Sequence, residues 1–163
     1  MTDLIFHSLH NDLKKRTGNF HYYLENYKQS VLNAAEAGVK VICYNFMPVV
    51  DWTRTSLSYR LSNNSQALRF DLADFAAYDV SILERNNAKD SYSEEVLERA
   101  DRRLESMSTE EKVLLEKNII AGLPGGEGSY DRDSIRNEIE AFIALGVEGF
   151  RQNLIEFLQE IIP

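Results

Sequence analysis

The apolar positions of the first 44 residues predict a strand, a helix and a second strand. Residues 4–9 (LIFHSL) favour a short strand, and apolar residues then recur at helical spacing between positions 20 and 35. The Thr17-Gly18-Asn19 turn offers a cap before this helix, and Gly38 stands where a C′ glycine belongs. Residues 39–44 (VKVICY) form a nearly continuous apolar run, which predicts a strand buried on both faces. This order is typical of a βαβ unit in a parallel sheet.

The rest of the chain is predicted to be mostly helical. Residues 45–56 favour a loop, and residues 57–61 and 67–70 favour a hairpin around SNNSQ. A polar link covers residues 85–91, and the glycines of residues 122–128 interrupt the pattern. The predicted helices, most of them opened by a capping residue or closed by a glycine, cover residues 71–84, 93–107, 108–121, 131–146 and 148–162.

Composition and charge exclude several classes of protein. The chain has 163 residues, 44% of them hydrophobic and 27% charged, as in a soluble globular protein with a real core. Its net charge of −8 argues against a nucleic-acid partner and against an anionic membrane surface. The single cysteine, Cys43, rules out an internal disulfide, and no apolar run is long enough to span a membrane. Since the first residues also do not resemble a signal peptide, we expect a cytoplasmic protein.

Most candidate chemical groups have a simpler structural interpretation. His7 and His10 are three residues apart, but the segment is predicted to be extended and no third metal ligand is obvious. Cys43 lies inside a predicted strand, where a cysteine usually belongs to the core. The glycine-rich residues 122–128 match neither phosphate-binding fingerprint. The paired acids lie at predicted helix starts or on solvated faces, so none is expected to be catalytic.

The segment after the second strand has the strongest functional signal. Asn45, Asp51, Trp52 and Arg54 follow a buried strand, and ligands of parallel α/β proteins bind at the carboxyl ends of the strands. The forked donors of an arginine suit a carboxylate. The alternative is structural, with Trp52 packed under the loop and Arg54 paired with an acid.

The same segment carries a resemblance to a known family. The run VICYNFMPVVDWTRT (residues 41–55) resembles the CYNFMP–DWTRT stretch of the mannonate dehydratases. Further similar segments follow the family's order, and the resemblance covers about residues 8 to 163. They are TGNFHYYLENYKQ (17–29), ALRFD (67–71), NIIAGLPG (118–125) and NLIEFLQEIIP (153–163).

The resemblance implies a fold and an activity. Mannonate dehydratases are (β/α)₈ barrels that convert D-mannonate to 2-keto-3-deoxy-D-gluconate in hexuronate catabolism, with Mn²⁺ or Fe²⁺. By resemblance, His10, Asn45, Trp52 and Arg54 are expected to line or shape the substrate site. No catalytic residue and no metal ligand is expected in this chain, because the family's His, Cys and Asp ligands lie on later strands, beginning in an I-H-P-D-D motif. The match is poor upstream of about Ser8, and the family typically has a glutamate and a proline where this chain has His7 and Leu9.

The expected fold is therefore α/β, a fragment of a (β/α)₈ TIM barrel that is mostly helical, with two to four short strands. We expect a single partial domain over residues 1–163. It would comprise a strand–helix unit over about 1–56, a helical insertion over about 57–146 and the helix of the next barrel unit over 147–163. Such a piece would leave sheet edges and apolar helix faces uncovered, which favours association, including a homo-oligomer.

Two functional hypotheses remain, and both predict that the isolated chain is inactive and binds no metal. In the first, the chain belongs to a mannonate dehydratase. In the second, it is a truncated or degenerate, non-catalytic remnant that self-associates. A third hypothesis, a helical interaction module, is disfavoured by the resemblance.

Overall fold

A computed structural model describes residues 4–49, 52–120 and 131–162 of the chain. The chain forms two compact units. Unit 1 comprises Met1–Val49 with Asn137–Pro163, and unit 2 comprises Val50–Arg136. The described residues are mostly helical and contain four short strands, as the sequence predicted.

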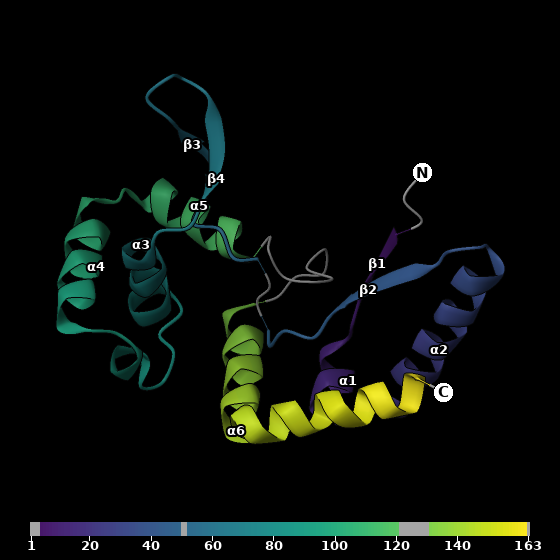
Figure 1. Ribbon diagram of the computed structural model, residues 1–163. Coiled ribbons are helices and arrows are strands. Elements are labelled where there is room, and N and C mark those ends of the chain that lie inside the picture. The colour runs from purple at the N-terminus through teal and green to yellow at the C-terminus, as the bar shows by residue number, and fades with distance from the viewer. Residues whose placement is uncertain (1–3, 50–51, 121–130, 163) are drawn as a thin grey trace. The chain divides into compact units, whose positions relative to one another are not determined.

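Unit 1 contains a strand–helix–strand unit with parallel pairing. Strands β1 (Leu4–Ser8) and β2 (Val41–Asn45) lie side by side, in a register that runs from Leu4 opposite Val41 to Ser8 opposite Asn45 (Figure 1). The crossover between them contains helices α1 (Asn11–Lys15) and α2 (Phe20–Glu36). Parallel strands require such a crossover, so the prediction of a βαβ unit is confirmed. Helix α1 was not predicted, because five mostly polar residues carry no helical periodicity.

The turn before α2 differs in detail from the prediction. Asn19 occupies the N-cap position, but its side chain makes no capping hydrogen bond, so that part of the prediction is wrong. Instead, the Asn19 backbone N–H donates to Oδ2 of Asp12 over 3.3 Å. Gly18 has a φ of 54°, and Gly38 has a φ of 84° just after α2, which confirms the C′ glycine.

The prediction that β2 is buried on both faces is wrong for this structure. Val41 is 54% exposed and Tyr44 is 38% exposed. In the described part of the chain, this sheet has only the strands β1 and β2, so one edge and part of a face of β2 remain uncovered.

The core of unit 1 forms between the crossover helices and the C-terminal helix. Its buried residues are Leu9, Leu13, Leu24, Tyr27 and Phe157. The rings of Tyr27 and Phe157 meet edge to face with centroids 5.3 Å apart.

Helix α6 (Arg132–Ile161) supplies Phe157 and is broken at Gly146, whose φ of 71° is not helical (Figure 1). The two halves agree with the two helices predicted on either side of Gly146. Ion pairs of Lys15 with Glu138 and of Arg16 with Glu160 tie both halves to the end of α1.

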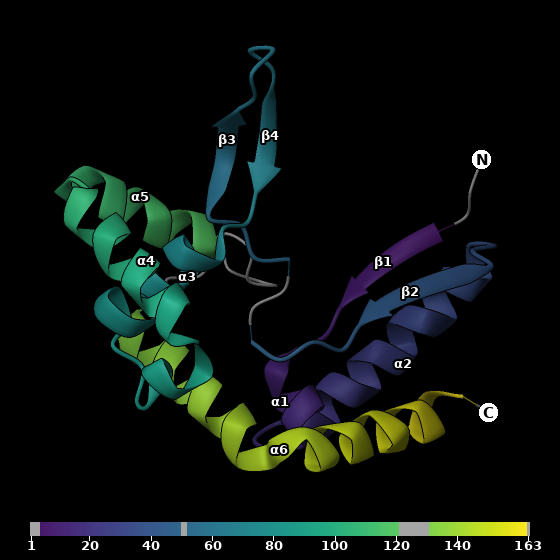
Figure 2. The same ribbon diagram turned by 60° about the vertical axis from the view of Figure 1, so that its left-hand side comes forward.

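Unit 2 consists of a hairpin and a group of short helices. Strands β3 (Ser56–Arg60) and β4 (Gln66–Arg69) pair antiparallel and project from the helices, which confirms the predicted hairpin (Figure 2). The helical elements are α3 (Leu72–Ala77), the π-helical η1 (Tyr78–Ile82), the 3₁₀-helical η2 (Ala88–Ser91), α4 (Glu94–Ser106) and α5 (Thr109–Ile120).

The predicted caps of unit 2 are present. Asp71 accepts the N–H groups of Ala73 and Asp74 at the start of α3. Ser108 and Glu111 form the reciprocal capping box before α5, with hydrogen bonds of 3.2 and 2.8 Å. These local signals explain why the helix starts could be predicted from the sequence.

The helix after Asp71 changes character where the sequence predicted a continuous helix. It passes into the π-helical η1, which places Asp79 in the interior at 4% exposure. Asp79 accepts Nε and Nη2 of Arg85 at 2.8 and 2.7 Å and the hydroxyl of Tyr92 at 2.7 Å. This buried network connects the polar link of residues 85–91 to the helices. No helix in the described residues is both long and apolar enough to cross a membrane.

Candidate functional site

The carboxyl end of the β1–β2 sheet brings two predicted site residues to the same edge. Asn45 is the last residue of β2 and lies opposite Ser8 at the end of β1, and His10 follows two residues later. The two side chains therefore start near the carboxyl ends of the strands, where parallel α/β proteins bind ligands.

Asn45 has an unsatisfied donor. The residue is 9% exposed, and its Nδ2 has no hydrogen-bond partner in the described structure. A buried amide without a partner costs about 1–3 kcal/mol, so native proteins rarely keep one without a reason. A ligand that accepts from Nδ2 would supply such a reason.

His10 has a structural role that the sequence did not reveal. It is the N-cap of α1, and its Nδ1 accepts the backbone N–H of Asp12 over 3.1 Å. The neutral ring must then carry its proton on Nε2, which is left as a donor. The ring stacks on Tyr23 with centroids 3.9 Å apart and lines a cavity of about 160 Å³ between α1 and α2.

The segment after β2 has strained backbone on both sides of residues 50–51. Val49 has a φ of 47° and Trp52 a φ of 56°, and neither is a glycine. A β-branched or bulky residue rarely adopts positive φ, and such strain gathers at ligand sites. Asp51 lies outside the described residues.

Trp52 and Arg54, which belong to unit 2, do not have the purely structural roles that the sequence left open, namely packing under the loop and pairing with an acid. The indole of Trp52 is 61% exposed, so it is not packed under the loop. Nη1 of Arg54 donates to the carbonyl oxygens of Trp52 and Thr53 at 2.6 and 2.9 Å, and no acid among the described residues pairs with Arg54. These bonds hold the guanidinium by one nitrogen, which leaves Nη2 and Nε to face a carboxylate.

The sequence analysis missed Lys14, which is only 1% exposed. Its Nζ donates to Oδ1 of Asn11 over 3.3 Å, and its carbonyl accepts Nδ2 of Asn153. A lysine is rarely buried, and the sequence HNDLKK does not distinguish Lys14 from the less buried Lys15.

Metal ligands do not gather in the described residues. No group of three or more His, Cys, Asp or Glu side chains that could hold a metal ion occurs there. Cys43 is half-buried in β2. The glycine-rich residues 122–128 lie outside the described part of the chain.

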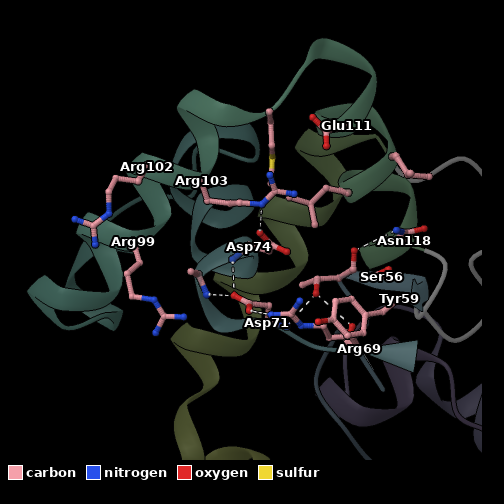
Figure 3. A pocket seen from close by; sticks show the side chains of 15 residues that line it. Ser56, Tyr59, Arg69, Asp71, Asp74, Arg99, Arg102, Arg103, Glu111 and Asn118 are labelled. Atoms are coloured by element: carbon pink, nitrogen blue, oxygen red, sulfur yellow. Dashed lines mark hydrogen bonds and ion pairs between the residues drawn. The ribbon is translucent and has the colours of Figure 1, made fainter. Parts of the chain in front are cut away.

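Unit 2 also contains a larger cavity that the sequence did not predict. Its volume is about 670 Å³, and it lies between the base of the hairpin and helices α3, α4 and α5 (Figure 3). Its charged lining residues are Arg69, Asp71, Asp74, Arg99, Arg102, Arg103 and Glu111.

Comparison with known proteins places the sequence in a family. Residues 5–163 match the family model described as D-mannonate dehydratase (UxuA). Over 155 residues, the chain is 70% identical to a mannonate dehydratase of Saccharophagus degradans and 48% identical to one of a Marinomonas species. These alignments cover 95% of this chain and 39% and 40% of the two relatives, so the chain spans about two fifths of their length.

The chain is also similar to a solved structure. The mannonate dehydratase of Streptococcus suis serotype 2 aligns with 99% of this chain and 32% of its own, at 24% identity and a TM-score of 0.49.

Proposed function

Because the chain belongs to the D-mannonate dehydratase family, we propose that it forms part of an enzyme that dehydrates D-mannonate. The observation that carries the proposal is the 70% identity to a curated mannonate dehydratase along nearly the whole chain. In the proposed reaction, a base removes the proton from the carbon next to the carboxylate and the neighbouring hydroxyl leaves. The products are water and 2-keto-3-deoxy-D-gluconate.

We propose that unit 1 is a strand–helix unit of a (β/α)₈ barrel. The parallel pairing of β1 and β2 and the helical crossover support this. The proposed organisation keeps the predicted boundaries, with the barrel unit over about 1–56, the helical insertion over about 57–146 and the next barrel helix over 147–163.

The proposed substrate site uses the four predicted residues. Asn45 and His10 would donate from Nδ2 and Nε2 to substrate oxygens, since Nδ2 of Asn45 has no partner in the described residues and Nδ1 of His10 is used as an acceptor. Arg54 would bind the carboxylate through its remaining guanidinium nitrogens, and the exposed indole of Trp52 would cover the sugar chain.

The resemblance to the family implies Mn²⁺ or Fe²⁺, which would stabilise the negative charge that develops next to the carboxylate. The described residues do not fit this ion, because they contain no suitable group of ligands. We therefore assign no step to a metal in this chain and expect the 163 residues alone to be inactive. We place the enzyme in the cytoplasm.

A chimera tests the assignment of the site. The 155 matched residues of the Saccharophagus degradans relative are replaced by those of this chain, and D-mannonate turnover is measured with Mn²⁺. Arg54→Ala is expected to lower kcat/KM by about 10- to 100-fold, because a charge-assisted hydrogen bond is worth about 1.5–3 kcal/mol. Arg60→Ala, an exposed arginine of the hairpin, is the matched control and should change kcat/KM by less than about twofold. Equal effects of the two substitutions would remove Arg54 from the site.

Asn45→Ala separates a role in binding from a role in folding. Since Nδ2 already lacks a partner, the substitution should change the free energy of unfolding by less than about 1 kcal/mol. It should still lower kcat/KM by about tenfold or more. A large loss of stability with unchanged kcat/KM would make Asn45 a structural residue.

A further inference from the structure

The 670 Å³ cavity of unit 2 is lined by four arginines in a chain whose net charge is −8. Arg69 comes from β4, and the other three come from one face of α4 at spacings of three and four residues: Arg99, Arg102 and Arg103. Like charges at these spacings repel one another, so such a cluster is unfavourable unless anions neutralise it.

The acids that line the cavity are already engaged. Asp71 caps α3 and pairs with Arg69, and Asp74 accepts Nε of Arg103 over 2.8 Å. Glu111 accepts the backbone N–H of Ser108 in the capping box. Two of the three lining carboxylates are therefore paired with arginines, and the third takes part in a helix cap.

Two of the arginines keep most of their donors free. Arg99 makes no hydrogen bond or ion pair within the described residues, and Figure 3 shows its side chain without a dashed line to the other lining groups. Arg102 meets Glu98 only at 3.9 Å, with both side chains 68% exposed, and a pair of that kind contributes little.

The other lining groups suit a hydroxylated ligand. Ser56 and Tyr59 bring hydroxyl groups from the hairpin, and the ring of Tyr59 lies 4.4 Å from the guanidinium carbon of Arg69. This cation–π contact keeps Arg69 at the wall. A cavity of this volume is within the usual range for small-molecule sites.

We propose that this cavity, named here the arginine pocket, binds a small hydroxylated organic anion through a carboxylate or phosphate group held by Arg99 and Arg102, the two lining arginines that are not paired with a lining acid. Guanidinium groups bind both kinds of oxyanion with paired donors. The site lies wholly within unit 2 and does not depend on the proposed dehydratase activity.

Binding to the 163-residue chain tests the proposal without any turnover. The probes are D-gluconate, D-glucose 6-phosphate and the uncharged D-glucitol, each titrated while backbone amide and arginine side-chain NMR signals are followed. At least one of the two anions is expected to bind, to shift the signals of Arg99 and Arg102, and to bind at least about tenfold more tightly than D-glucitol. Preference for D-gluconate would identify a carboxylate site, and preference for the sugar phosphate a phosphate site.

Matched variants separate the pocket from the general charge of the chain. Arg99→Gln should weaken binding by about tenfold or more, and Arg99→Lys, which keeps the charge and loses the fork, by less. Arg151→Gln makes the same change of charge at an exposed arginine of unit 1 and should weaken binding less than about twofold. The proposal is overturned if neither anion binds at about 10 mM, if D-glucitol binds equally well, if the shifts fall outside the pocket, or if Arg151→Gln weakens binding as much as Arg99→Gln.

Discussion

The turn at Gly18 provides a sharp test of how the start of α2 is built. A Cβ at this position would lie 2.7 Å from Oδ2 of Asp12, a distance that real Cβ atoms essentially never show, and 3.1 Å from its Cγ, which is tighter than most real Cβ contacts. The Asp12 carboxylate would have to move and would lose its hydrogen bond with the Asn19 N–H. Gly18→Ala should therefore cost about 1–2 kcal/mol for the left-handed backbone and about 1 kcal/mol more for the displaced carboxylate.

Gly38→Ala is the matched control, because a Cβ there would meet no atom within 4 Å. Its φ of 84° lies farther from the left-handed minimum than the 54° of Gly18, so its backbone cost is at least as large. Both variants lose the same unfolded-state entropy, which cancels in the comparison. The free energy of unfolding is measured in urea by circular dichroism, and Gly18→Ala is expected to be the more destabilising by about 1 kcal/mol. If it costs no more than Gly38→Ala, or if Asp12→Ala does not reduce its cost, the steric account is wrong.

Two further predictions concern unit 2. Asp79→Asn should lower the free energy of unfolding, measured in urea, by about 3 kcal/mol or more, because it leaves the buried guanidinium of Arg85 without its counter-charge. A loss below about 1 kcal/mol would show that the network around Asp79 contributes little to stability. Burial, with the nearby charge of Glu116, raises the pKa of Tyr78 from 10.0 to about 12. The folded state thus keeps this proton to higher pH than the unfolded state. The corresponding stability, about 3 kcal/mol, is complete below pH 10 and is lost as the pH rises toward about 12. The free energy of unfolding in urea is measured at pH 7, 10 and 11. Tyr78→Phe should reduce the loss of stability at alkaline pH and should not destabilise the protein at pH 7, because the Tyr78 hydroxyl has no described partner. An unchanged alkaline loss would contradict the assignment of this loss to Tyr78.

The parts of the fold that the sequence predicted are those with local signals. The capping residues Asp71 and Ser108 and the C′ glycine Gly38 each act within a few residues of the helix end that they mark. The kink at Gly146 was predictable for the same reason. Local hydrogen bonds and backbone freedom are properties of short segments, so they can be read without the tertiary structure.

The failures depended on distant neighbours. The exposure of Val41 depends on how many strands the sheet contains, which the pattern VKVICY does not state. The burial of Lys14 depends on packing around α1, and the π-helical segment at Asp79 on the positions of Arg85 and Tyr92.

The candidate site divides in the same way. The sequence pointed to the segment after β2, because ligand sites of parallel α/β proteins occur there. It did not show the unsatisfied Nδ2 of Asn45 or the capping role of His10, which depend on atomic positions. The arginine pocket was missed because Arg69 and the arginines of α4 are separated by about thirty residues and meet only in the folded unit.

The most direct test of the central claim is the rate of D-mannonate dehydration by the Saccharophagus degradans chimera, measured beside its parent enzyme and the isolated 163-residue chain. We predict that the chimera forms 2-keto-3-deoxy-D-gluconate within about tenfold of the parent's rate and that the isolated chain forms none. A folded chimera that binds Mn²⁺ but does not dehydrate D-mannonate would contradict the assignment of this chain to a working dehydratase. Turnover by the isolated chain would contradict the expectation that it lacks the catalytic metal site.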